Sequence, residues 1–144
     1  MTIAAILKEK GSDVVSVTPD TTVAQIAQII SSRRIGAVIV LGAGGELAGI
    51  VSERDVVKAL AAKAEAVDTL RAEQIMTREV TVAEPSTTVE EAMEIMDHGY
   101  FRHLPVVDGG KLVGIISIRD AVKARLRRHE DDEQNLRSYI HGRM

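Results

Sequence analysis

Two short polar patterns stand out in mostly apolar sequence, and each places an aspartate three positions after a serine. The first is Ser52 with Asp55, and the second, 65 residues later, is Ser117 with Asp120. A serine and an acid at this spacing can cap a helix start, which stabilises the helix by about 1 kcal/mol. The same helix start offers free N–H groups to a phosphate, and a carboxylate can accept hydrogen bonds from the paired hydroxyls of a ribose. The pattern therefore fits a structural cap or a nucleotide-binding corner.

Cationic side chains accompany both patterns. Arg54 and Arg119 directly precede the two aspartates, and each can either lie over the first helical turn or reach a ligand phosphate. Arg102 and His103 precede an apolar run, where burial of such side chains is costly unless they are paired. They fit an ion pair with the acidic segment 90–94, or a phosphate, for which charge-assisted hydrogen bonds contribute about 1.5–3 kcal/mol each.

Composition excludes several kinds of chemistry. The chain has no cysteine, so thiolate catalysis and thiolate metal sites are ruled out. Its four histidines show no recognised metal-ligand spacing, and neither serine has a histidine that sequence logic places as its base. A net charge of −3 and few aromatic residues argue against a nucleic-acid partner. We therefore expect that the chain is not an enzyme and holds no catalytic cofactor or metal. The enzymatic alternative is a nucleotide hydrolase.

The chain shows no targeting or membrane-spanning segment that sequence rules would recognise. Residues 1–10 lack the basic start of a signal peptide, and no apolar run approaches the length of about 18 that spans a bilayer. We therefore expect a cytoplasmic location and no membrane partner.

The two serine–aspartate patterns close two copies of one unit. Residues 49–59 recur as 114–124, and residues 19–23 recur as 85–89. A capping box begins a helix in each copy, at Thr22 and at Thr88. Each unit reads strand, helix, strand, strand, helix, which is an α+β pattern with a glycine-containing turn between the paired strands. The expected elements are strands 14–17, 37–41, 47–51, 103–107 and 112–116, and closing helices 55–63 and 120–129. Pro105 favours an edge or strand-start position, because proline cannot donate to a ladder.

The two copies of the unit divide the chain into five segments. Residues 1–10 are expected to form a short helix or arm on the body, and residues 129–144 a charged, partly solvated helical extension that packs on a partner subunit. Between them lie the first repeat (11–62), a linker (63–74) and the second repeat (75–128). Two copies of one unit predict a fold of two-fold character with paired clefts.

The pair of units resembles a tandem CBS (cystathionine-beta-synthase) domain pair, or Bateman module, over residues 11–128. The resemblance rests on Gly-x-x-Ser-x-x-Asp at the end of each repeat and on the segment from Phe101 to Asp108. It implies two intertwined β-α-β-β-α repeats related by a pseudo-two-fold axis. It also implies a homodimer shaped as a disk, with the second helices as contacts. The candidate contact residues are Val56, Val57, Leu60, Val122 and Leu126.

The resemblance further implies that each cleft joins the serine–aspartate corner of one repeat to the early strands of the other. The aspartate would hold an adenosine ribose, and the serine would lie near the phosphate or ribose. Cleft one would contain Ile50, Ser52, Arg54, Asp55, Thr81, Arg102, His103, Leu104 and Pro105. Cleft two would contain Val15, Ser16, Ile35, Gly36, Ala37, Ile115, Ser117, Arg119 and Asp120.

The two clefts are expected to differ, because Gly36 and Ala37 stand where the second repeat has Arg102 and His103. Cleft one should be richer in phosphate-binding groups and suit AMP, ADP or ATP. Cleft two should be roomier and have fewer cations. NAD(H) and S-adenosylmethionine are the other possible ligands of the module. In either cleft the adenine should lie between aliphatic side chains, since no aromatic residue is positioned to stack.

These observations favour a ligand-sensing module without catalysis that reports its occupancy to an unknown effector protein. The alternative from a different class is a structural or oligomerisation protein whose serine–aspartate pairs only cap helices.

Overall fold

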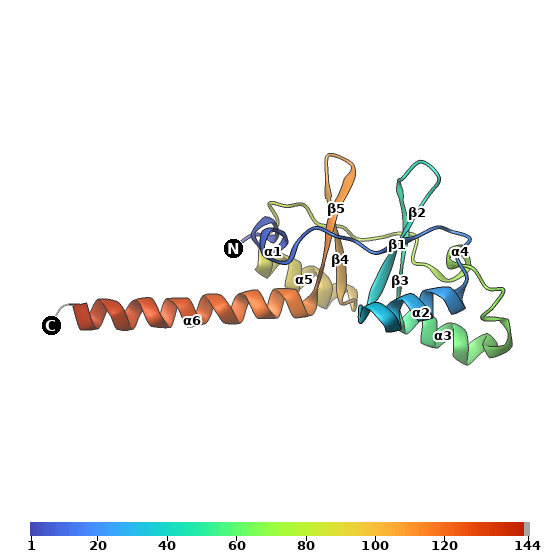
Figure 1. The fold of residues 1–144 in the computed structure, drawn as a ribbon. Coiled ribbons are helices and arrows are strands. Elements are labelled where there is room, and N and C mark those ends of the chain that lie inside the picture. The colour runs from blue at the N-terminus through green and yellow to red at the C-terminus, as the bar shows by residue number, and fades with distance from the viewer. Residues whose placement is uncertain (143–144) are drawn as a thin grey trace.

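The computed structural model describes residues 1–142, with the side chains of residues 1–140. Two units of strands and helices lie side by side, and their hairpins project in the same direction (Figure 1). One long helix runs beneath the second unit and extends well beyond it. The mixed α/β fold with two repeats confirms the fold class predicted from the sequence.

The first repeat is a three-stranded sheet with two helices. Strand β1 runs parallel to β2, and β2 pairs with β3 in an antiparallel hairpin, which gives the order β1-β2-β3. Its elements are β1 (Ser16–Val17), α2 (Val23–Arg33), β2 (Ala37–Leu41), β3 (Leu47–Ser52) and α3 (Glu53–Lys63).

The second repeat copies this plan with a shorter first strand. Strands β4 and β5 form an antiparallel hairpin, and Ala83 makes an isolated parallel bridge to Val106, where the first repeat has β1. The N–H of Ala83 donates to the carbonyl of Pro105 at 2.9 Å. Pro105 is the third residue of β4, which pairs with β5 on one side and bridges to Ala83 on the other, so the strand is an edge only within the two-stranded β4–β5 sheet. The elements are α5 (Val89–Gly99), β4 (His103–Asp108), β5 (Lys111–Ser117) and α6 (Ile118–Gly142).

Both predicted capping boxes are present. The N–H of Gln25 donates to the hydroxyl of Thr22 at 3.2 Å, and the N–H of Thr22 donates to Gln25 Oε1 at 3.0 Å. Thr88 and Glu91 repeat the arrangement at the start of α5. Because both helices begin in the same way, the strands that follow them enter the body at equivalent places.

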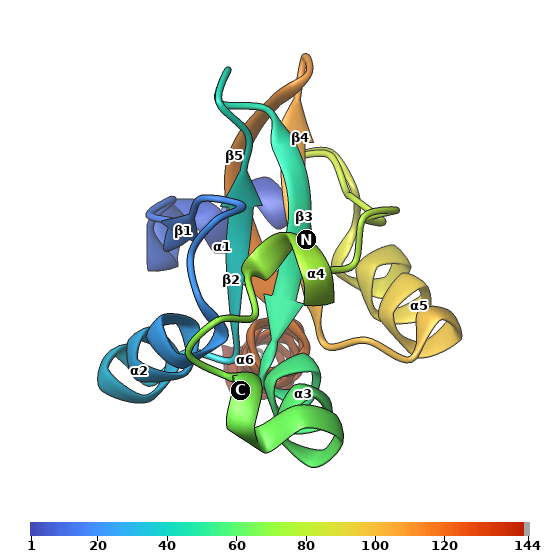
Figure 2. The ribbon, with the colours of Figure 1, turned by 90° about the vertical axis from the view of Figure 1, so that its right-hand side faces the viewer.

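The repeats are interlocked through the helices that precede them. Helix α1 (Ile3–Lys10) packs into the core of the second repeat, where Ile3 and Ile6 are buried. Helix α4 (Ala72–Ile75) packs into the core of the first repeat through Ala72. Figure 2 shows α4 lying against the first repeat. Each repeat thus completes the other's core, and this confirms the intertwined arrangement.

The structure adds detail to two predicted segments and corrects one predicted contact. The segment expected as a linker contains a 3-10 turn, η1 (Ala64–Ala66), and the start of α4. The closing helix expected to about residue 129 runs without a break into the expected helical extension, so α6 continues to Gly142. Acid–base pairs four residues apart, such as Arg127 with Asp131, support a helix there. Val56 is buried in the first repeat's core and is therefore no surface contact, whereas Val57, Leu60, Val122 and Leu126 are exposed.

Candidate functional site

Each serine–aspartate pair lies where a hairpin strand passes into a helix. At the start of α3, the N–H of Ser52 donates to Asp55 Oδ2 at 2.9 Å, and the N–H of Asp55 donates to Ser52 Oγ at 3.4 Å. At the start of α6, the matching bonds of Ser117 and Asp120 are 2.8 and 3.1 Å. Both pairs therefore cap their helices. All the bonds accepted by the Asp55 carboxylate come from Ser52 and end on Oδ2, so within residues 1–142 its Oδ1 is left for a ligand.

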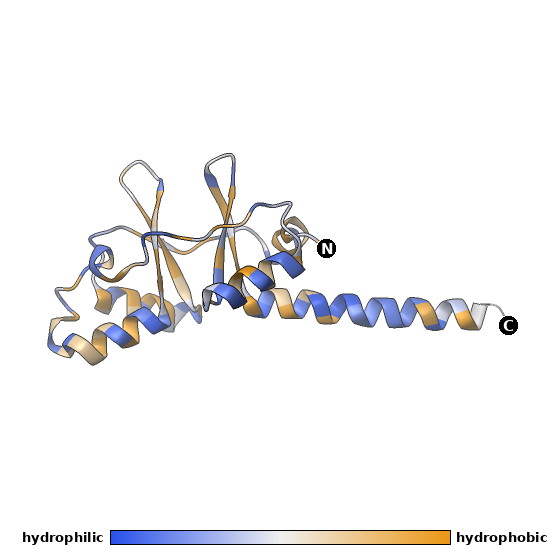
Figure 3. Ribbon diagram, turned by 180° about the vertical axis from the view of Figure 1, so that it is seen from behind, coloured by the Kyte–Doolittle hydropathy of each residue, from blue (hydrophilic) through white to orange (hydrophobic). Residues whose placement is uncertain are grey.

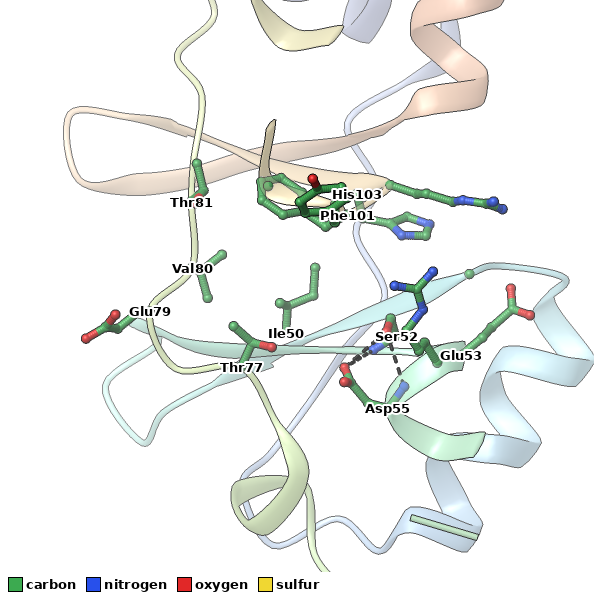
Figure 4. A pocket seen from close by; sticks show the side chains of 15 residues that line it. Ile50, Ser52, Glu53, Asp55, Thr77, Glu79, Val80, Thr81, Phe101 and His103 are labelled. Carbon is green, nitrogen blue, oxygen red and sulfur yellow. Dashed lines mark hydrogen bonds between the residues drawn. The ribbon is translucent and has the colours of Figure 1, made fainter. Parts of the chain in front are cut away.

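Cleft one is a cavity of about 470 Å³ between the repeats. Figure 4 shows Phe101 and His103 of the second repeat facing Ile50, Ser52 and Asp55 of the first. Seven of the nine residues expected there do line it: Ile50, Ser52, Arg54, Asp55, Thr81, Arg102 and His103.

The two exceptions are Leu104 and Pro105, which are both buried and do not line the cavity. Leu104 follows His103 in β4, so its side chain points to the opposite face of the hairpin and enters the second repeat's core. Sequence position alone could not separate the two faces at this strand start.

The connecting segment supplies a wall of cleft one that sequence reasoning missed. Thr77, Glu79 and Val80 line the cavity together with Thr81. Thr77 is tied to the first repeat because its N–H and C=O bond to the C=O and N–H of Ile50 at 3.0 and 3.1 Å. This backbone pairing holds the segment against β3, beside the serine–aspartate corner.

Aromatic residues also line cleft one, where the sequence predicts only aliphatic surface for the adenine and no aromatic residue positioned to stack. Phe101 lines the cavity, is partly buried and packs on the second repeat's core. Tyr100 lines the rim, and its side chain is 86% exposed. Both residues directly precede Arg102 in the sequence, and that adjacency was the signal that could have placed them.

Cleft two is larger, at about 980 Å³, in agreement with the expectation of more room. Eight of its nine expected residues line it: Val15, Ile35, Gly36, Ala37, Ile115, Ser117, Arg119 and Asp120. Ser16 is exposed on β1 and does not line the cavity.

The expectation that cleft two has fewer cations is wrong. Lys10 arrives from the end of α1 and Arg34 from the end of α2, and both line the cavity together with Arg102 and Arg119. Tertiary packing brings Lys10 and Arg34 to the cleft from outside the repeated strands. A comparison of the strand residues alone therefore does not include them.

Lys10 makes the chemical difference between the two aspartates. Its Nζ donates to Asp120 Oδ2 at 2.8 Å and to the carbonyl of Ile115 at 2.9 Å. Burial alone would raise the pKa of Asp120, but hydrogen bonds from Lys10 and Ser117 hold it below its usual value. Asp55, in contrast, forms no ion pair with any of the described residues. The residue that matches Lys10 in the second repeat, 66 positions later, is the uncharged Met76.

His103 lies at the border of the two clefts and lines both. A Cβ atom on Gly36 would lie 2.6 Å from His103 Nε2, so a larger residue at this position would displace the His103 ring. Burial lowers the pKa of His103, and the charges of Lys10 and Arg102 lower it further, against the opposing effect of Glu53 and Asp120. Burial therefore favours the neutral form of the imidazole.

Comparison with known proteins places this architecture in a family. The CBS domain matches the chain twice, over residues 7–62 and 72–127. The chain is 32% identical over 150 residues to the mitochondrial CBS domain-containing protein CBSX3 of Arabidopsis thaliana, covering 98% of this chain and 72% of that protein. The chain belongs to the CBS domain family, whose paired domains are regulatory ligand-binding modules.

Solved structures support the same assignment. The CBS-domain protein ATU1752 of Agrobacterium tumefaciens is 43% identical, with a TM-score of 0.83 over 86% of this chain and 92% of that one. The CBS domain pair of the protein MJ0100, in complex with 5-methylthioadenosine and S-adenosyl-L-methionine, is 25% identical, with a TM-score of 0.75 over 90% of this chain and 98% of that one.

Within residues 1–142, no helix combines the length and the apolar character needed to cross a bilayer.

Proposed function

We propose that this chain is a regulatory module that binds an adenine nucleotide (AMP, ADP or ATP) in cleft one and signals its occupancy to an effector protein, without catalysis of its own. The observation that carries the proposal is the carboxylate of Asp55, whose Oδ1 takes no bond from the described residues in a cavity shared with Arg54, Arg102 and His103. The adenosyl ligands of the MJ0100 domain pair support the ligand class.

The cavity offers a separate group for each part of a nucleotide. A carboxylate that only accepts suits the two ribose hydroxyls, and the start of α3 with Ser52 and Arg54 suits an anion. Arg102 and His103 enter from the other repeat and would complete a phosphate site. Ile50, Val80 and Phe101 provide apolar surface for the adenine. A ligand in this position would bridge both repeats.

Cleft two would fill after cleft one. A ribose there competes with Lys10 for the Asp120 carboxylate, because the ammonium group already bonds to Oδ2. Its larger volume suits a bigger adenosyl ligand such as NAD(H), or S-adenosylmethionine. Occupancy of either cleft would order the interface between the repeats and shift an existing equilibrium of the module, which is how the signal would reach the effector. The cytoplasmic location stays a prediction, since the Arabidopsis relative is named as mitochondrial.

Thermal unfolding with a panel of compounds tests this function. A ligand present at 100 times its dissociation constant should stabilise the fold by about 2.7 kcal/mol. We expect AMP, ADP or ATP to raise the unfolding temperature, and ribose 5-phosphate to have a much smaller effect, because it lacks the adenine. The same samples, analysed for hydrolysis products, should show no turnover. If none of the nucleotides, NADH or S-adenosylmethionine shifts the transition, the proposal is wrong.

A second candidate is a purely structural protein, and one observation favours it: both serine–aspartate pairs form complete capping arrangements with their own backbone. Asp55→Asn separates the two functions, since an amide oxygen can still accept from the Ser52 N–H. For a structural protein, this variant would change only the unfolding temperature. For a nucleotide sensor, it would also remove the shift that the ligand causes.

A further inference from the structure

Helix α6 extends beyond the body and presents a face that nothing in the described chain covers. Its first turns pack on the second repeat through Ala121, which is buried, and Ala124, which lies against the same core. Beyond residue 128 the helix leaves the body, and Figure 3 shows this part as mainly hydrophilic with separate hydrophobic bands. The exposed apolar side chains are therefore concentrated at particular positions along the helix.

Four large apolar side chains form one stripe along α6. Val122, Leu126, Leu136 and Ile140 are 41, 59, 59 and 54% exposed. Together with His129 and Glu133 they follow the alternating spacing of four and three residues that a coiled-coil seam requires. At about 100° per residue, these six positions fall within a sector of about 80°. Ala121 and Ala124 lie on the opposite side, so the stripe points away from the body.

We propose that this stripe pairs with the same stripe of a second copy of the chain as a parallel two-stranded coiled coil. The side chains that flank the seam determine the direction. In a parallel pair, Arg125 faces Glu130 of the second copy, and Asp132 faces its Arg137. Both contacts join opposite charges, and symmetry repeats each of them. Such flanking pairs set the orientation of coiled coils.

An antiparallel pair that aligns the leucines would place like charges together along the same flanks. With Leu126 opposite Leu136 of the other copy, Glu130 would face Glu130, and Asp132 would face Asp132. Lys123 would face Arg137. Like charges in such positions are unfavourable. Antiparallel registers shifted by a heptad would avoid these contacts but would place Leu126 opposite His129 or leave it outside the apolar layers, so apolar packing and charge together favour the parallel arrangement.

The middle of the seam is polar, which sets the register. His129 and Glu133 occupy two consecutive seam positions, and polar seam residues specify register at a cost in stability. In the parallel pair, His129 of one copy lies one layer from Glu133 of the other. A shift by one heptad would instead place these polar groups against leucine. The two bodies do not meet across the seam, since each lies on the outer side of its own helix.

Disulfide trapping tests the pairing and its direction, because the natural chain has no cysteine. In a parallel pair, Leu126→Cys and Leu136→Cys should each form a disulfide-linked dimer alone under mild oxidation. Ser138→Cys, on the opposite side of the helix, is the matched control and should not. If neither seam variant forms a dimer alone but a mixture of the two does, the pair is antiparallel and the proposed direction is wrong.

Sedimentation equilibrium of uncrosslinked protein tests the affinity. Leu136→Asp should raise the dimer dissociation constant at least about a hundredfold, because it places charge in an apolar layer on both helices. Arg125→Glu should raise it about fivefold, and adding Glu130→Arg should restore it. A monomer at all concentrations for the unaltered chain would refute the pairing, and so would failure of the double charge reversal to rescue.

Discussion

Cleft one and cleft two are built from the same repeated corner, yet their aspartates are in different states. Asp55 bonds only to Ser52 among the described residues, whereas Asp120 also accepts a hydrogen bond from Lys10. The difference does not come from the corner itself, whose residues are nearly the same in both repeats. It comes from the helix that precedes the opposite repeat, which ends in Lys10 for cleft two and is followed by Met76 for cleft one. The intertwining of the repeats thus allows one side chain to make duplicated clefts unequal.

The largest expected effect comes from Asp55→Asn. This change keeps an acceptor for the Ser52 N–H but removes the charge that two ribose hydroxyls would share, so AMP affinity should fall about a hundredfold. Calorimetric titration measures it. Asp120→Asn is the matched control and should change the AMP affinity of this first binding event by no more than about twofold. Equal losses in the two variants would mean that the aspartates serve one shared site.

Arg102→Ala should weaken AMP binding about tenfold, since it removes a charge-assisted hydrogen bond to the phosphate. Adenosine has no phosphate, so its affinity should hardly change. Arg128→Ala, on the exposed part of α6, is the control for a change of net charge. A loss that is the same for AMP and adenosine would place Arg102 away from the phosphate.

Lys10→Met copies the residue of the other repeat and should make cleft two resemble cleft one. With the Lys10 bond to the Asp120 carboxylate removed, the second binding event should strengthen about fivefold, the modest gain expected when a partly exposed ion pair is removed. Lys8→Met, two residues earlier on α1, serves as the control. A weaker second event would show that Lys10 is itself a ligand contact and not a competitor.

The smallest expected effect is on pH dependence. Burial holds the pKa of His103 below its usual 6.5 in the folded protein. The contribution of His103 to the free energy of unfolding is therefore fully present above pH 6.5. It is lost as the pH falls from 6.5 toward the lower pKa of the folded state. A bound phosphate would raise the pKa of His103, so AMP binding should be coupled to proton uptake. AMP should therefore bind about threefold more tightly at a pH near the folded pKa of His103 than at pH 6.5.

His103→Gln identifies the source of that dependence. In this variant, the pH dependence of AMP affinity should come only from protonation of the phosphate itself, whose second pKa is about 6. The affinity for adenosine should not change with pH in either protein. An unchanged AMP profile in the variant would show that His103 does not face the ligand.

The repeats were visible in the sequence because each element carries its own local signal. Thr22 and Thr88 begin helices through capping boxes, and the glycine-containing turns join strands of similar length. Those signals act over a few residues, so they survive without tertiary information. The same holds for the serine–aspartate corners, which the structure shows at equivalent strand ends.

The rest of the candidate site depended on contacts between distant segments. Lys10 reaches Asp120 because α1 packs on the second repeat, and Thr77 reaches Ile50 because the connecting segment pairs with β3. No local pattern encodes either contact. Helix α6 combines two predicted parts, a closing helix to about residue 129 and a helical extension after it. The sequence contains no proline or glycine between Ile118 and Gly142 that would separate them.

A crystal structure of the chain with AMP would show whether Asp55 holds the ribose. We expect AMP in cleft one, with the ribose hydroxyls on Asp55, the phosphate near Arg54 and Arg102, and the bond between Lys10 and Asp120 intact. AMP found in cleft two alone, with Asp55 still bonded only to Ser52, would contradict it.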